Sequence, residues 1–249
     1  MHNLRIIARL DIKSDKVVKG INLEGIRKIG DPKNLALKYY REGIDEIIYM
    51  DVVASLYERN TITKFIKEAA SKVFVPLTVG GGIRNLKDIR KVLNNGADKV
   101  AINTAAIKNP NFIKEAAKAI GSQSIIVSIE AKRKKGFWEA YYDNGREKSG
   151  LDVISWAIKA QEFGAGELLI TSVDQEGLES GMDVELLRSL RNEITIPIIF
   201  SGGVGSVKDI INVVPEADAV AIASIFHYNK ISVKEIKQDL NKKNIIIRT

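Results

Sequence analysis

The chain has 249 residues, of which 45% are hydrophobic, 28% charged and 6% aromatic, and its formal net charge is +7. This composition is that of a globular protein and excludes an intrinsically disordered one. The sequence contains no cysteine and only two histidines, which excludes disulfides, thiolate metal sites and cysteine nucleophiles and argues against a histidine-rich metal cluster. We therefore expect no metal and no other cofactor.

The hydropathy pattern argues against a membrane protein. No uncharged apolar run approaches the roughly 18 residues that a membrane span needs. The first apolar run is interrupted by Arg9 and Asp11, which is unlike a signal peptide. We expect a cytoplasmic protein without a membrane partner. Most lysines are scattered over predicted helix faces, apart from a cluster at 132–135, and this favours a solvated surface over a nucleic-acid interface.

Short apolar segments rich in β-branched residues alternate with amphipathic helical segments along the whole chain. The expected strands are Ile6–Ile12, Glu46–Val52, Val75–Val79, Lys99–Asn103, Ser124–Glu130, Glu167–Ser172, Pro197–Ser201 and Ala219–Ala223. The expected helix-capping signals are Asp31-Pro32 with Gly43, Asn109-Pro110 with Gly121, and Ser232 with Glu235. Nearly continuous apolar strands that alternate with helices predict a parallel sheet covered by helices.

The second half of the chain repeats the first at an offset of about 120 residues. The ordered matches are 43–48 with 164–169, 81–89 with 202–210, and 97–102 with 217–222. Each half carries four strand–helix units, and two such halves predict one (βα)8 TIM barrel over residues 1–249. A doubly wound open sheet is the alternative. Two independent domains are not expected, because each half alone would expose its sheet edges.

Carboxylates stand at two strand ends that correspond in the repeat. Asp11 lies at the end of the first strand, one residue before its last, and Glu130 ends the fifth. In a (βα)8 barrel these ends lie opposite each other on the face where active sites form, so we predict that Asp11 and Glu130 form a catalytic acid–base pair. The alternative is that each carboxylate binds a neighbouring lysine or caps a turn.

Two related glycine turns suggest anion-binding sites. Gly81-Gly82 and Gly202-Gly203 each follow a strand and precede a helix, where backbone N–H groups approach an oxyanion closely. Two copies predict an elongated substrate with a phosphate at each end. The candidate substrate-binding residues are Lys19, Gly81, Gly82, Asn103, Thr104, Thr171, Glu176, Ser201, Gly202, Gly203, Ala223 and Ser224.

Two further features stay open at this point. Lys19 lies in the long connection 13–31, either on a mobile lid over the substrate or as a solvated loop residue. Four charged residues stand at strand beginnings and are expected to form a ring of ion pairs, either a structural network or a gate for something small: Arg5, Glu46, Lys99 and Glu167.

The motifs at 5–11, 17–20, 30–32, 78–82, 97–105 and 201–203 resemble the cyclase subunit of imidazole glycerol phosphate synthase of histidine biosynthesis, and the likeness runs from Arg5 to Arg248. The resemblance implies a heterodimer with a glutaminase subunit that docks on the N-terminal face of the barrel, near Asp98. Ammonia then passes the charged ring and crosses the barrel. It reacts with a bisphosphorylated ribulosyl formimino carboxamide nucleotide to give imidazole glycerol phosphate and an aminoimidazole carboxamide ribotide.

The sequence departs from that family at several positions. Glu130 and Glu176 stand where the family has aspartate, Arg9 where it commonly has cysteine, and Leu178 where it has a hydroxyl residue. One alternative is therefore a paralogue that works with a glutaminase to supply ammonia for amidation of a sugar nucleotide in surface-polysaccharide synthesis. A non-enzymatic barrel that binds nucleic acid through 132–135 is another, but it leaves the repeated carboxylates and glycines unexplained.

Overall fold

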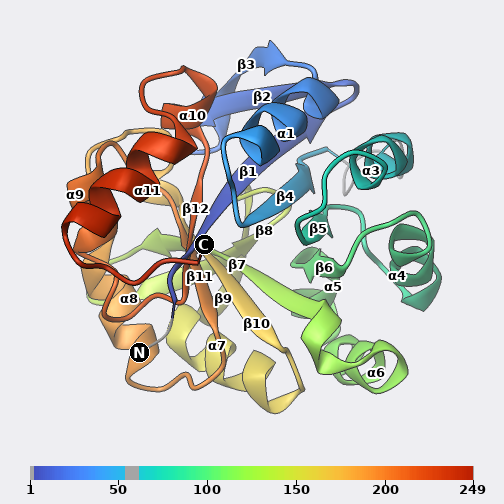
Figure 1. Cartoon of the computed structure of the whole chain (residues 1–249). Coiled ribbons are helices and arrows are strands. Elements are labelled where there is room, and N and C mark those ends of the chain that lie inside the picture. The colour runs from blue at the N-terminus through green and yellow to red at the C-terminus, as the bar shows by residue number, and fades with distance from the viewer. Residues whose placement is uncertain (1–2, 54–61, 249) are drawn as a thin grey trace.

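The computed structural model describes residues 3–53 and 62–248. Eight parallel strands form a closed barrel within these residues (Figure 1). In barrel order they are β1 (Arg5–Lys13), β4 (Glu46–Asp51), β5 (Leu77–Gly80), β6 (Lys99–Ile102), β7 (Ile125–Arg133), β10 (Glu167–Ser172), β11 (Ile198–Ser201) and β12 (Ala219–Ile222). The pairing of β10 with β7 and of β12 with β1 closes the ring. The predicted (βα)8 fold is thus confirmed, and the open-sheet alternative is wrong.

Helices cover the outer face of the barrel, as Figure 1 shows. The helical segments are α1 (Pro32–Arg41), α3 (Ile62–Ala70), α4 (Leu86–Leu93), α5 (Thr104–Lys108), α6 (Asn111–Ile120), η1 (Ser122–Ser124), α7 (Val153–Glu162), η2 (Val173–Gln175), α8 (Val184–Arg191), α9 (Val207–Ile211), α10 (Ser224–His227) and α11 (Val233–Lys242). Within the described part of the chain, no helix combines the length and the apolar character needed to cross a membrane.

Local capping chemistry explains where several helices begin. The Asp31 side chain accepts a hydrogen bond from the N–H of Asn34 at 3.0 Å, and Ser232 and Glu235 form a capping box at the start of α11. Both signals are confirmed. The signal at Asn109 is wrong, because Pro110 takes the N-cap position of α6 and no side-chain hydrogen bond caps that helix.

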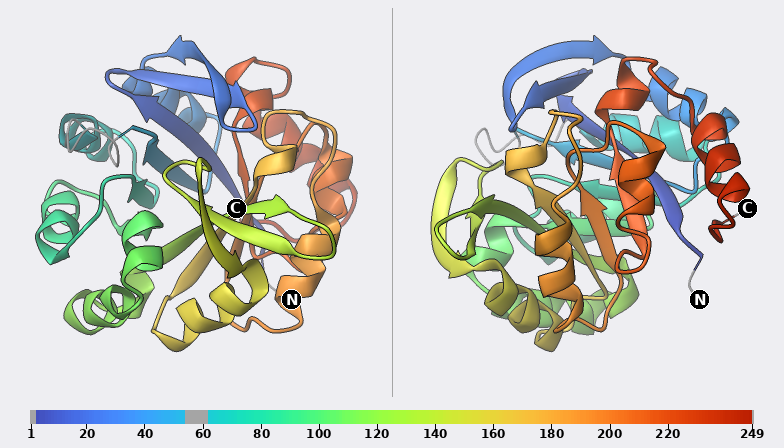
Figure 2. Two further views of the ribbon diagram at one scale, coloured as in Figure 1. Left: turned by 180° about the vertical axis from the view of Figure 1, so that it is seen from behind. Right: turned by 90° about the vertical axis from the view of Figure 1, so that its left-hand side faces the viewer.

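Two β-hairpins extend the barrel at corresponding places in its halves. After β1 come β2 (Lys16–Ile21) and β3 (Glu24–Gly30), and after β7 come β8 (Trp138–Tyr142) and β9 (Glu147–Asp152). The connection 13–31 is therefore a paired hairpin and not an open loop. The second hairpin was not predicted. Figure 2 shows both hairpins at one end of the barrel, opposite the end where Leu4 pairs with Ile247.

The barrel interior consists of layers that follow the alternation of each strand. Along β1, this alternation places Arg5, Ile7, Arg9 and Asp11 on the inward face. The layer at Ile7 is an apolar cluster of Ile7, Ile48, Ala101, Ile126, Leu169, Ile199, Ala219 and Ala221. Charged residues therefore lie both below and above an apolar middle layer.

Candidate active site

Asp11 and Glu130 occupy opposite sides of the barrel mouth. β1 and β7 are four strands apart in the closed order of eight, and each carboxylate lies toward the C-terminal end of its strand. Asp11 is 5% exposed and Glu130 is 7% exposed. The fold thus brings the predicted pair to one end of the interior, on facing walls.

The local environment of Glu130 favours its protonated form. Its Oε2 accepts a hydrogen bond of 2.7 Å from the backbone N–H of Gly145, in the turn between β8 and β9. Burial raises the pKa of Glu130 to about 7, against the opposing effects of that N–H and of Arg9, and the negative charge of Asp11 adds to the rise. Glu130 can therefore exchange a proton near neutral pH.

Asp11 has the opposite electrostatic environment. Its Oδ1 accepts a hydrogen bond of 2.9 Å from Nε of Arg9. Burial by itself would raise the pKa of Asp11, but Arg9 and Lys19 outweigh burial and hold this pKa below its usual value. The pKa of Asp11 is thus lowered while that of Glu130 is raised. Such a pattern is found where two acids have different catalytic roles.

Arg9 also engages two of the predicted substrate contacts. Its Nη1 donates to Thr171 Oγ1 at 2.8 Å and to Ser201 Oγ at 3.5 Å. These hydroxyls therefore hold the guanidinium in place.

Lys19 lies on β2, within the first hairpin, and is only 3% exposed. Its ammonium group forms an ion pair with Glu176, and the N–H of Asn22 donates to the carbonyl of Glu176 at 2.7 Å. Burial lowers the pKa of Lys19 to about 8, although Asp11 raises it. The alternative of a solvated lysine is wrong. The contacts instead join the hairpin to the segment after β10.

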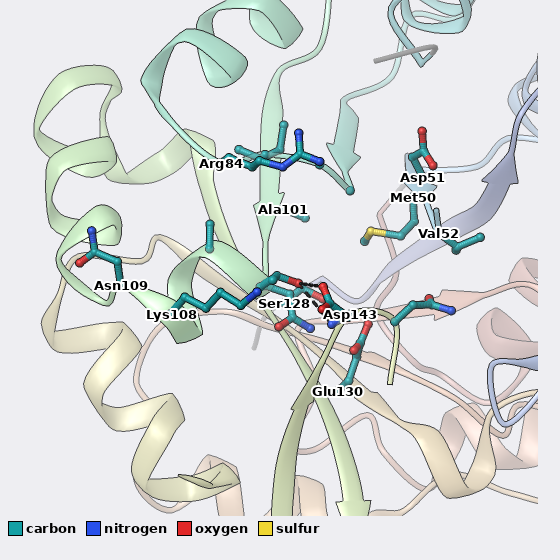
Figure 3. A pocket seen from close by; sticks show the side chains of 17 residues that line it. Met50, Asp51, Val52, Arg84, Ala101, Lys108, Asn109, Ser128, Glu130 and Asp143 are labelled. Atoms are coloured by element: carbon teal, nitrogen blue, oxygen red, sulfur yellow. Dashed lines mark hydrogen bonds between the residues drawn. The ribbon is translucent and has the colours of Figure 1, made fainter. Parts of the chain in front are cut away.

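The first glycine turn borders a cavity of about 350 Å³ (Figure 3). Its lining residues include the predicted residues Gly81, Gly82, Asn103, Thr104 and Glu130. Gly81 has φ +91°, and a Cβ there would lie 2.1 Å from the carbonyl oxygen of Asp51. Glycine is therefore required sterically at this turn, next to an open space that reaches a predicted catalytic carboxylate.

Several residues that line the same cavity were not predicted. Arg84 and Lys108 extend toward it from the segments after β5 and β6, as Figure 3 shows. Asp143 accepts a hydrogen bond from Thr104 Oγ1 at 3.0 Å. The sequence held a signal for this last contact, because Asp143-Asn144-Gly145 is a typical hairpin turn that separates two segments with strand character.

The second glycine turn borders a much smaller cavity of about 10 Å³. Its lining includes Ser201, Gly202, Gly203, Ala223, Ser224 and Glu176. Gly202 has φ +104°, and a Cβ there would lie 2.6 Å from the carbonyl oxygen of Ser172. The two predicted phosphate sites are thus built alike but are unequal in open volume.

The four charged residues at the strand beginnings form a closed ring of ion pairs. Glu46 contacts Arg5 at 2.9 Å and Lys99 at 3.3 Å. Glu167 contacts Lys99 at 3.0 Å and also pairs with Arg5. Burial disfavours the charged guanidinium, but the two glutamates outweigh it and raise the pKa of Arg5. The two glutamates therefore stabilise the charged form of Arg5 within the ring.

Asp98 is exposed next to this ring, and it also has a local structural role. Its Oδ2 accepts a hydrogen bond of 2.8 Å from the N–H of Leu77 at the start of β5. Asp218 makes the equivalent bond to the N–H of Ile198 at 2.8 Å. The same contact occurs in both halves of the barrel. Asp98 therefore stabilises the beginning of β5 in addition to being exposed.

Histidines contribute no metal site to the described residues. Nδ1 of His227 lies 2.7 Å from the hydroxyl of Tyr39, while His2 lies outside the described residues. Among residues 3–53 and 62–248, no three His, Asp or Glu side chains are grouped so that they could hold a metal ion.

Comparison with known proteins assigns the chain to a family. The family model described as "Histidine biosynthesis protein" matches residues 5–232. The chain belongs to this family. It is 52% identical over 210 residues to imidazole glycerol phosphate synthase subunit HisF of Legionella pneumophila, with 84% of this chain and 99% of the relative covered. It is 46% identical over 248 residues to the subunit of that name from Lactococcus lactis, with 98% and 96% covered. The relative of that name from Dehalococcoides mccartyi is 43% identical over 250 residues, with 100% and 99% covered.

Proposed function

We propose that this protein is the cyclase subunit of imidazole glycerol phosphate synthase. It uses ammonia to convert a bisphosphorylated ribulosyl formimino carboxamide nucleotide into imidazole glycerol phosphate and an aminoimidazole carboxamide ribotide. The observation that carries the proposal is the pair Asp11 and Glu130, which face each other at the barrel mouth between two glycine turns. The comparisons support the same activity through the names of the relatives.

The two carboxylates divide the proton transfers between them. Asp11 stays ionised, so it can orient ammonia and take a proton from the attacking nitrogen. Glu130 has a pKa of about 7 and can both give and accept a proton as the ring closes and the second product leaves. Both carboxylates are buried, which limits their own contact with bulk water.

The substrate would lie across the mouth with one phosphate at each glycine turn. The open cavity at Gly81 and Gly82 offers backbone N–H groups together with the cationic side chains of Arg84 and Lys108. The turn at Gly202 and Gly203 would bind the other phosphate. Because the cavity there is small, the ion pair between Glu176 and Lys19 would have to move to admit it. This arrangement supports an elongated bisphosphate ligand.

The charged ring and Asp98 lie on the face where, in our proposal, the partner binds. The relatives are named as subunits, which supports an assembly with a second chain. In our proposal a glutaminase binds at the strand beginnings, and its ammonia passes the ring of Arg5, Glu46, Lys99 and Glu167. The apolar layer above the ring then favours neutral ammonia over ammonium, because an ion would lose its hydration there. The names of the relatives favour this function over amidation of a sugar nucleotide.

The test is a turnover assay with purified protein, the bisphosphate substrate and excess ammonium salt at about pH 8, where part of the ammonium is free ammonia. We expect imidazole glycerol phosphate, and we expect Asp11→Asn to lower kcat at least about a hundredfold. Asp239→Asn, which changes a partly exposed carboxylate on α11, far along the chain from either strand end, is the matched control and should turn over like the unaltered protein. Absence of the product with the unaltered protein would overturn the proposal.

A further inference from the structure

The Arg9 side chain crosses the barrel interior. It is 2% exposed, and it reaches from β1 to Thr171 on β10, three strands away in the closed order. Ile7 lies one inward position below it on β1, in the apolar layer, and Asp11 one inward position above it. The guanidinium therefore lies between the apolar layer and the carboxylate of Asp11.

Three hydrogen bonds fix this guanidinium and point it at one carboxylate. Nε donates to Asp11 at 2.9 Å, and Nη1 donates to Thr171 at 2.8 Å and to Ser201 at 3.5 Å. Arginine does not lose its proton in proteins, so the charge beside Asp11 is permanent. The two hydroxyls are neutral and accept from Arg9, so Asp11 is the one carboxylate among these three hydrogen-bond partners.

We propose that Arg9 is a positioning residue that keeps Asp11 ionised and fixes the orientation of its carboxylate for the reaction. The inference rests on the proposed function of Asp11. Arg9 itself need not touch the substrate. It acts through Asp11, because a buried carboxylate without a cationic partner would take up a proton and could no longer accept one from ammonia.

The other titratable groups near Asp11 cannot replace this charge. Lys19 on β2 is paired with Glu176, and its pKa of about 8 lets it lose its proton in mildly alkaline solution. Burial lowers the pKa of His227 on α10 to about 4, so this side chain is neutral at pH 7. Glu130 on β7 carries either no charge or a negative one. Arg9 is thus the fixed cation that faces Asp11 among these groups.

The test follows the proton affinity of Asp11 directly. Protein with aspartate labelled in the side-chain carboxyl by carbon-13 is titrated by NMR, and Asp11→Asn identifies the Asp11 signal. We expect Arg9→Gln to raise the proton affinity of Asp11 at least about tenfold, and Arg9→Lys to raise it less, because lysine keeps the charge. Arg9→Met, also neutral, serves in place of Arg9→Gln if that variant does not fold. An unchanged midpoint in the neutral variant overturns the inference, even where its melting temperature falls.

Turnover gives the second readout. We expect the neutral variant to lower kcat for the ammonia-dependent reaction at least about tenfold and to move the acidic limb of its pH profile upward, with KM for the bisphosphate substrate changed less than about threefold. A rise in KM with kcat unchanged would overturn the inference. The proposed function fails if the unaltered protein makes no product, whereas the NMR titration decides the role of Arg9 in either case.

Discussion

Glu130 accepts a hydrogen bond of 2.7 Å from the backbone N–H of Gly145, and this contact ties the end of β7 to the turn of the second hairpin. The bond holds the carboxylate at the edge of the open cavity, where Asp143 and Asn144 of the same turn also line the wall. Glutamate has a longer side chain than the aspartate that the resembled family has at this position. The hydrogen bond to the Gly145 N–H thus holds the longer side chain in place.

Replacing Glu130 with glutamine should stabilise the protein at the expense of activity. Because the pKa of Glu130 rises from 4.5 to about 7 on folding, the folded state binds more protons than the unfolded state between these values. Stability therefore falls as pH rises through this window. The destabilisation caused by the ionised, buried carboxylate of Glu130 is fully present above about pH 7. Glu130→Gln removes it and should add up to about 3 kcal/mol to the free energy of unfolding near pH 8.

Urea unfolding of the variant and the unaltered protein at about pH 8 and about pH 4 checks this expectation. The difference should shrink at the lower pH, where Glu130 is protonated in both states. Glu185→Gln, on an exposed ion pair with Arg133, is the control and should change stability by less than about 0.5 kcal/mol at either pH. Activity of Glu130→Gln should fall about a hundredfold or more. A variant less stable than the parent at the higher pH contradicts the account.

The charged ring should matter for delivery of ammonia and not for the chemistry. Lys99 lies at the strand beginnings, at the opposite end of the barrel from Asp11 and Glu130. We therefore expect Lys99→Met to leave turnover with added ammonium salt within about twofold of the parent. Turnover with glutamine and the partner glutaminase should fall at least about fivefold, because the ring loses one of the two cations that join Glu46 to Glu167.

Parallel assays with the two nitrogen sources measure this difference. Lys242→Met, an exposed lysine on α11, controls for loss of one positive charge. Equal losses with ammonium salt and with glutamine would show that the ring acts on the active site or on folding, and the gate interpretation would then be wrong.

The sequence predicted those parts of the site that depend on the repeat. Asp11 and Glu130 recur at equivalent strand ends, and the two glycine turns recur with them, so the strand order alone placed them at one mouth. Contacts that depend on side-chain reach were not predictable in this way. The reach of Arg9 across the interior to Thr171 is a property of the closed barrel, and no local pattern contains it. The hairpin β8–β9 was missed although Asp143-Asn144-Gly145 marked its turn, because the basic cluster at 132–135 was interpreted as surface.

The glycine turns should tolerate no side chain. At Gly81 and Gly202 an added Cβ would meet a carbonyl oxygen at 2.1 Å and 2.6 Å, and both residues have positive φ. We expect Gly81→Ala and Gly202→Ala each to displace the turn and to raise KM for the bisphosphate substrate at least about tenfold, with a loss of about 2 kcal/mol in stability. Steady-state kinetics and urea unfolding measure the two effects.

Gly43→Ala is the matched control for these variants. Gly43 also has positive φ, +87°, but an added Cβ would find nothing within 4 Å. The Gly43→Ala variant should therefore lose about 1 kcal/mol of unfolding free energy through backbone strain alone, with KM unchanged. If Gly43→Ala raised KM as much as Gly81→Ala, the turns would have no specific role in binding phosphate.

Substrate affinity should depend on the protonation of Lys19. The pKa of Lys19 is about 8, below its usual value, so the ammonium form that attracts phosphate is lost as pH rises through that value. Binding of the bisphosphate substrate without ammonia, measured by calorimetry, should weaken about tenfold or more between about pH 7 and about pH 9.5. Lys19→Met should bind more weakly at pH 7 and should lack this alkaline decline. Lys16→Met, in the same strand but only partly buried, should keep it. If the alkaline decline persisted in Lys19→Met, it would come from another group. Lys19 would then not belong to the phosphate site.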